Sequence, residues 1–128
     1  NALFNGVDTT AEQIAERLAD PRCVEIPIVA EVDHRIVGFA GVRVVPQIFY
    51  AGAHAELTEL FVEEGYRRRG IARALIEFAE RLAESQGADK VVIHTGEDNH
   101  AAQTFYSTMG YAPWEIVMGK TLSPLDPF

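Results

Sequence analysis

An abrupt change in hydrophobic periodicity at Gly70 constrains the fold of this 128-residue chain more than any other feature. Residues 55–62 before it have the composition and length of a β-strand. After it, apolar side chains recur at helical spacing, with charged side chains on the opposite face. These apolar residues are Ile71, Ala74, Leu75, Phe78, Ala79 and Leu82. The pattern therefore predicts a strand that passes through a short loop into a long amphipathic helix, which closes near Gly87.

Local patterns predict further elements on both sides of this helix. Glu12 follows Thr9 by three residues, and Gln13 follows Thr10 by three, which is the spacing of a capping box. The helix that begins there is expected to end at Pro21. The predicted strands are residues 24–32, 36–45, 55–62, 91–95 and 111–121, and a further helix is residues 99–109. Because strands and helices are mixed and a hairpin comes first, we predict an α/β or α+β fold with a mixed sheet.

Size and composition indicate one globular domain over residues 1–128. Apolar runs are shorter than the roughly 20 residues that span a bilayer. No basic region followed by an apolar one precedes residue 13, so we expect no signal peptide and a cytoplasmic location. Cys23 is the only cysteine, which excludes an internal disulfide.

The charge balance restricts the class of partner. Eleven Lys and Arg against 19 Asp and Glu give a net charge of −8, which repels nucleic acid and anionic membranes. The basic residues are concentrated locally: Arg67, Arg68, Arg69 and Arg73 lie within one short stretch. A positive region on a negative protein favours a small anionic ligand over a polyanion.

The stretch from Tyr66 to Ala72 has the properties of an anion site. The first N–H groups of a helix have no intrahelical partner, and the helix dipole favours negative charge there. Gly70 lets a ligand approach the backbone closely. A solvated basic turn is the alternative. Gly65 and Gly70 have P-loop spacing, but Ile71 and Ala72 replace the Lys and Ser/Thr of that motif, and no GxGxxG occurs.

Two blocks resemble the GNAT acyl-CoA N-acyltransferases. The first is the loop residues Arg67, Arg68, Arg69, Gly70, Ile71 and Ala72, which match the family's Arg/Gln-x-x-Gly-x-Gly/Ala motif. The second is Asn99, Ala102, Phe105, Tyr106, Gly110 and Tyr111, which match its Asn-x-x-Ala-x-x-Phe/Leu-Tyr-x-x-x-Gly-Phe/Tyr pattern. The resemblance covers residues 24–121. It implies a mostly antiparallel mixed sheet flanked by helices, with a splayed central strand.

The resemblance also implies how acetyl-CoA binds. In the family, backbone amides of the loop matching the first block hold the coenzyme A pyrophosphate. The pantetheine arm pairs with the bulged central strand, which corresponds here to the main chain of Leu60, Phe61 and Val62. Asn99 matches a residue that often contacts coenzyme A, and it also has the position of a helix cap.

Two catalytic roles follow from the same resemblance. Tyr106 matches the frequent general acid that protonates the departing thiolate, although a core tyrosine is the alternative. Glu59 is our choice for the base that takes the amine proton, with Glu56 as the competitor and His54 as a weaker one. Glu56 and Glu59 are three apart on a strand, so we expect them on opposite faces unless a bulge intervenes.

The implied activity is transfer of an acetyl group from acetyl-CoA to a primary amine on a small molecule or peptide, and the acidic surface favours a cationic acceptor. A non-catalytic acyl-CoA-binding or regulatory module is the alternative.

No metal is expected, because His94, Glu97, Asp98 and His100 lack tight ligand spacing. We expect the family's usual N-terminal strand and helix to be missing. The sequence leaves the oligomeric state open, a homodimer included.

Overall fold

The computed structural model describes the backbone of residues 2–4, 7–8 and 10–123 and the side chains of residues 10–123. The chain divides into two compact units, residues 1–93 and 94–128. The described elements of the first unit are β1 (Ala2–Phe4), β2 (Val7–Asp8), α1 (Ala11–Ala19), β3 (Ile26–Val32), β4 (Arg35–Val45), β5 (Ala53–Val62), the 3-10 helix η1 (Glu64–Tyr66), α2 (Ile71–Ser85) and β6 (Ala88–Ile93). The second unit contributes α3 (His100–Thr108).

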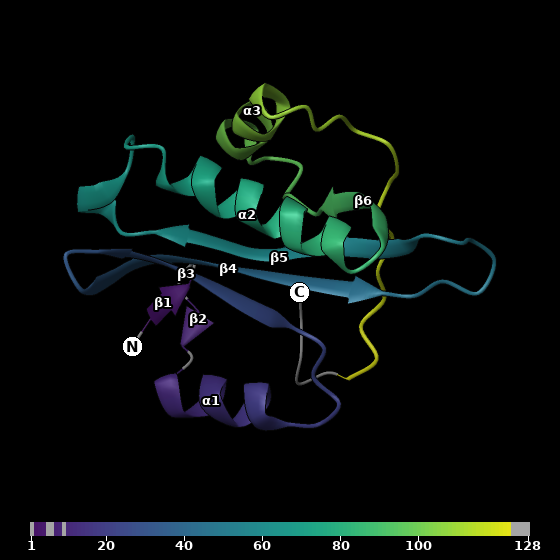
Figure 1. Cartoon of the computed structure of the whole chain (residues 1–128), viewed down its shortest axis with the longest axis horizontal. Coiled ribbons are helices and arrows are strands. Elements are labelled where there is room, and N and C mark those ends of the chain that lie inside the picture. Colours follow the sequence, from purple (N-terminus) through teal and green to yellow (C-terminus); the bar gives the residue numbers. More distant parts are fainter. Residues whose placement is uncertain (1, 5–6, 9, 124–128) are drawn as a thin grey trace. The chain divides into compact units, whose positions relative to one another are not determined.

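A four-stranded sheet in the order β3-β4-β5-β6 forms the centre of the first unit (Figure 1). β3, β4 and β5 are antiparallel neighbours, whereas β6 runs parallel to β5. The turn between β3 and β4 places Asp33 and His34 at positive φ, 50° and 63°, as tight hairpins require. The parallel pair needs a crossover, and α2 is the helix between its strands. The expected mixed, mostly antiparallel sheet is confirmed.

Helix α2 packs along one face of this sheet (Figure 1). Its buried side chains are Leu75, Ile76, Ala79 and Ala83, one stripe of the predicted amphipathic helix. They meet the buried residues Ala40, Val42, Ala55, Leu57 and Val62 of β4 and β5. Figure 1 shows α1 on the side of the other face, and none of its residues is buried. Thr10 and Gln13 form the predicted capping box of α1.

Several element boundaries differ from the prediction. β6 begins at Ala88, and His94 and Thr95 lie beyond its end. The short antiparallel pair of β1 and β2 occupies the N-terminal stretch for which we predicted no strand. No helix in the described part of the chain is long and apolar enough to cross a membrane.

The predicted strand over residues 111–121 is wrong. These residues are described, and they form neither helix nor strand. Trp114, Ile116 and Met118 are 65%, 84% and 85% exposed. An apolar segment becomes a strand only where a neighbouring strand supplies hydrogen-bond partners, which a local pattern cannot reveal. Pro113 also has no N–H to donate.

Candidate acetyl-CoA and amine site

The turn between β5 and α2 exposes the beginning of a helix. After β5 the chain forms η1, then places Arg68 at φ 65° and Gly70 at φ 79°. Gly70 is the N-cap of α2 in the left-handed conformation, and no side chain caps the helix start. Left-handed backbone favours glycine. The turn therefore presents uncapped backbone N–H groups of α2 at the end of a strand, which is the geometry of an anion site.

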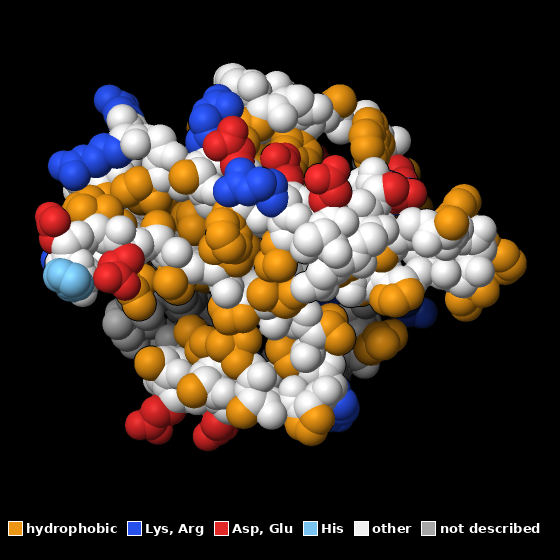
Figure 2. Space-filling model, in the orientation of Figure 1, with side chains coloured by type: hydrophobic (Ala, Val, Ile, Leu, Met, Phe, Trp, Pro, Cys, Tyr) orange, Lys and Arg blue, Asp and Glu red, His pale blue; other side chains and the backbone are white. Residues whose placement is uncertain are grey.

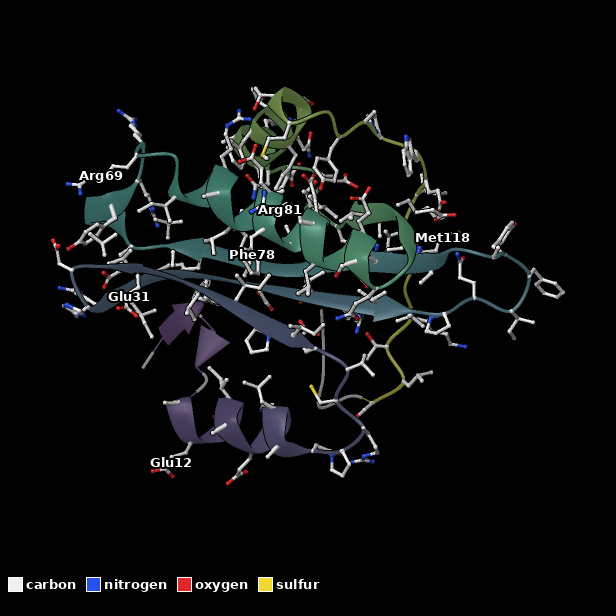
Figure 3. The ribbon with its side chains drawn as sticks, in the orientation of Figure 1. Glu12, Glu31, Arg69, Phe78, Arg81 and Met118 are labelled. Carbon is white, nitrogen blue, oxygen red and sulfur yellow. The ribbon has the colours of Figure 1, made fainter. Side chains whose placement is uncertain are left out.

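Arginines surround this turn, and two of them stabilise it. The Arg67 Nε donates to the Val62 carbonyl at 3.0 Å, which links the loop to the end of β5. The Arg69 guanidinium lies 5.0 Å from the centre of the Tyr66 ring. Figure 3 shows Arg69 at the end of the sheet where α2 begins, and Figure 2 shows basic side chains gathered at that end. The cluster predicted from sequence is thus assembled around the helix start.

β5 extends beyond its parallel neighbour. The ladder between β5 and β6 ends with Leu57 opposite Ile93, whereas β5 remains paired with β4 as far as Val62 opposite Gly38. The segment that contains Leu60 and Phe61 therefore follows the point at which β5 and β6 stop pairing. The resemblance implied a splayed central strand, and the pairing shows that β6 ends before this segment of β5.

β5 also contains a bulge, located at Thr58. Gly41 of β4 lies opposite Glu59, and the next residue, Val42, lies opposite Leu57, so Thr58 has no counterpart in β4. Such an extra residue reverses the alternation of side chains at that point. The two glutamates on β5 are consequently not related by simple alternation.

The pairing register places both glutamates on the sheet face away from α2. A Cβ at Gly38 would lie 3.4 Å from Leu75 Cδ1, so Gly38 faces α2, and Gly41, three residues on, faces away. Glu59 lies opposite Gly41, and Glu56 lies opposite Arg43, which shares the face of Gly41. Glu56 and Glu59 therefore lie on the same face, because the bulge at Thr58 supplies the exception to their expected alternation.

The two glutamates have different surroundings. Arg43 donates from Nε and Nη2 to Glu56 Oε1 at 2.9 and 2.6 Å, and Glu56 is the more buried partner. This ion pair raises the pKa of Arg43. Glu59 reaches solvent, yet partial desolvation raises the pKa of its carboxyl. Desolvation thus moves the pKa of Glu59 toward that of a general base.

Three residues that the sequence analysis did not single out lie beside these glutamates. Arg43 pairs with Glu56, and Thr58 donates to Glu25 Oε1. Desolvation, followed by repulsion from Glu59 and Glu56, raises the pKa of Glu25, while Arg43 opposes the shift. Because Glu25 is 33 positions from Thr58 in sequence, only the register of the β3–β4 hairpin could have indicated the contact. His54, opposite Val45, lies near the start of β5, before both glutamates.

The second unit carries the other predicted residues, Asn99 and Tyr106. Asn99 caps α3 by accepting from the Ala102 N–H at 3.2 Å, as predicted, and Gly110 follows the helix at φ 95°. The Tyr106 ring lies 5.6 Å from the Phe105 ring and 6.1 Å from the Tyr111 ring. Burial raises the pKa of the Tyr106 phenol, which favours its protonated form.

No group of three or more His, Cys, Asp or Glu residues within residues 10–123 is arranged to hold a metal ion. The structure thus assembles the predicted site residues in two groups: the loop, Leu60 to Val62 and Glu59 in one unit, and Asn99 and Tyr106 in the other.

Comparison with known proteins supports these assignments at the level of the family. The human N-acetyltransferase 8 is 34% identical over 83 residues, which cover 65% of this chain and 37% of that protein. An uncharacterized N-acetyltransferase of Mycobacterium bovis is 32% identical over 110 residues, 86% of this chain and 66% of that one. The chain thus corresponds to little more than a third of the human relative's length.

Solved structures share the fold. The aminoglycoside N-acetyltransferase AAC(6′)-Iy, in complex with a bisubstrate analog of coenzyme A and acetylneamine, superposes with a TM-score of 0.77 at 21% identity, covering 94% of this chain and 84% of that one. An aminoglycoside acetyltransferase from an uncultured soil metagenomic sample superposes at 0.75 with 21% identity, covering 93% and 77%. The model of the acetyltransferase (GNAT) family matches residues 4–111. The chain therefore belongs to the GNAT family of acetyltransferases.

Proposed function

We propose that this protein transfers an acetyl group from acetyl-CoA to a primary amine by direct attack of the amine on the thioester. The observation that carries the proposal is the junction of β5 with α2. There a strand that continues beyond the end of its parallel neighbour leads into a helix start with Gly70 at φ 79° and no side-chain cap. The names of the relatives, all N-acetyltransferases, support the same reaction.

Coenzyme A would bind in two parts. The uncapped N–H groups at the start of α2 would hold its diphosphate, with Arg68 and Arg69 adding positive charge. The main chain of Leu60, Phe61 and Val62 would pair with the amide groups of the pantetheine arm, as an added strand does. Asn99, besides capping α3, would contribute a contact to the cofactor.

The chemical step needs a proton acceptor and a proton donor. A neutral amine attacks the thioester carbonyl, the new C–N bond forms, and the C–S bond breaks. The Glu59 carboxylate takes the proton that the nitrogen must lose, and the Tyr106 hydroxyl gives a proton to the departing thiolate. The raised pKa values of both groups support these roles. Holding amine and thioester in one site would supply much of the acceleration.

The acceptor would be a cationic amine. The chain carries a net charge of −8, and acidic groups line the sheet face that carries Glu59. Aminoglycoside acetyltransferases are among the proteins that share this fold. Polyamines, aminoglycoside-like amines and peptide amines are therefore the acceptor classes to test first.

The test is release of the coenzyme A thiol by the purified protein with acetyl-CoA and a panel of such amines. We expect release that depends on an amine and exceeds the rate without one. A second measurement, calorimetric binding of acetyl-CoA, identifies the alternative. A protein that binds acetyl-CoA yet releases no thiol with any class of amine would be a non-catalytic acyl-CoA-binding module.

A further inference from the structure

Three residues that are distant in sequence come together at the bulge that precedes Glu59. The Thr58 hydroxyl donates to Glu25 Oε1, which joins β5 to the residue just before β3 across β4. Gly41 of β4 makes room for this bond: a Cβ there would lie 2.6 Å from Thr58 Oγ1 and 2.8 Å from Glu25 Oε1. We call Glu25, Gly41 and Thr58 the bulge latch.

The bulge latch contains Thr58, the extra residue that determines which sheet face the Glu59 side chain occupies. Thr58 is the extra residue of the bulge, and Glu59 follows it directly, opposite Gly41. Without the bulge, alternation would turn Glu59 toward the face opposite that of Glu56. A strand position with an extra residue has no ladder partner of its own, so a side-chain hydrogen bond is what holds Thr58 in place.

Glu56 is held by a different contact. Its carboxylate receives two hydrogen bonds from Arg43, which neutralises its charge within an ion pair. The hydrogen bond to Glu25 comes instead from the neutral hydroxyl of Thr58. Glu56 is thus held by Arg43, whereas Glu25 bonds to the bulge residue Thr58.

We propose that Glu25 and Thr58 are positioning residues for Glu59: their hydrogen bond, made possible by the absence of a side chain at Gly41, keeps the β5 bulge in the register that presents Glu59 for proton transfer. The inference rests on the proposed function, in which Glu59 accepts the amine proton. Displacing a catalytic group by about 1 Å can cost on the order of 100-fold in rate. A modest relaxation of the bulge would therefore be visible in kcat.

The experiment compares four variants of the full chain in amine-dependent thiol release. Thr58→Val removes the hydroxyl and keeps the shape, whereas Thr58→Ser keeps the donor. Glu25→Ala removes the acceptor, and Glu31→Ala is its matched control, since it removes one exposed carboxylate from β3, the strand that begins directly after Glu25. We expect Thr58→Val and Glu25→Ala to lower kcat by about 10- to 100-fold with unchanged acetyl-CoA affinity, while Thr58→Ser and Glu31→Ala stay within about threefold of the parent.

A second background separates positioning from a general loss of structure. In a Glu59→Gln protein, Thr58→Val and Glu25→Ala should lower kcat by less than about twofold further, because the group that they position is already gone. Equal losses in both backgrounds, or no loss in the parent, would overturn the positioning role while leaving the proposed reaction intact. Full activity of Glu59→Gln alone would instead overturn the base assignment and the positioning role with it.

Discussion

Tyr106 is a phenol whose surroundings favour the protonated form. Its ring packs against Phe105 and Tyr111, and burial raises its pKa further above neutrality. A group that remains protonated can donate to a leaving thiolate. We predict that Tyr106→Phe lowers kcat by roughly 100-fold and leaves acetyl-CoA affinity within about twofold, as kinetics and calorimetry would show. A Phe variant with full kcat, where chemistry limits the rate, would assign Tyr106 to packing alone.

Glu59 and Glu56 form a matched pair of carboxylates on one sheet face. Glu59→Gln keeps the shape and removes the proton acceptor, so kcat should fall by roughly 100- to 10,000-fold. Glu56→Gln weakens the ion pair with Arg43 and should affect stability more than kcat. If Glu59 only attracted a cationic acceptor, its variant would show mainly a raised KM. Loss of kcat in Glu56→Gln with a normal Glu59→Gln would reverse the assignment.

The raised pKa of Glu59 also makes a prediction about stability. Its folded pKa lies above its unfolded value, so the ionised carboxylate destabilises the folded state. The contribution of Glu59 to stability is therefore most favourable below its unfolded pKa of about 4 and declines as the pH rises through the folded pKa. Glu59→Gln should accordingly have the higher Tm at pH 7, and the difference should vanish at acid pH. A lower Tm of the variant at pH 7 would contradict partial desolvation of Glu59.

Among the elements, the start of α2 yields the clearest test of cofactor binding. Gly70→Val places a β-branched residue at φ 79°, where it is strained, and adds bulk beside the helix N–H groups. Gly87→Val is the matched control, because Gly87 has φ 90° near the other end of the same helix. We predict at least tenfold weaker acetyl-CoA binding for Gly70→Val, about 1.4 kcal/mol, and a smaller effect for both Gly87→Val and Arg68→Ala. Unchanged affinity of Gly70→Val by calorimetry would remove the loop from the site.

The centre of the sheet offers a second test at this scale. Gly41→Ala would bring a Cβ to 2.6 Å from Thr58 Oγ1, too close for the Thr58 hydroxyl to keep its position. Overpacking of this kind costs about 1–3 kcal/mol, so the free energy of unfolding in urea should fall by that amount. Gly65→Ala is the control, since nothing lies within 4 Å of its added Cβ. Equal stability of the two variants would contradict the close contact at the bulge latch.

Element by element, the sequence predicted what local patterns determine. The capping box at Thr10, the stripe of α2 and the cap at Asn99 depend on residues three or four apart, and all are confirmed. The bulge at Thr58 depends on which β4 residue lies opposite each β5 residue, so the sequence could name it only as an exception to the alternation of Glu56 and Glu59. The same dependence on a partner explains the failed strand over residues 111–121.

For the molecule as a whole, the two motif blocks predicted the family, and the match of the family model over residues 4–111 confirms it. Sequence reasoning could propose the loop of residues 67–72 for cofactor binding because these residues are contiguous in the chain. It did not find the contact between Glu25 and Thr58, because that contact joins residues 33 positions apart across an intervening strand. Long-range packing, rather than composition, determines that part of the site.

The most direct test of the central claim follows the acetyl group itself. The purified protein is mixed with acetyl-labelled acetyl-CoA and an amine that supports thiol release, and mass spectrometry quantifies the label on amine and protein together with the free thiol. Direct attack predicts equal amounts of acetylated amine and free thiol, with no label on the protein at any time. Thiol release without acetylated amine, or an acetylated protein that forms and then decays as product appears, would contradict the account.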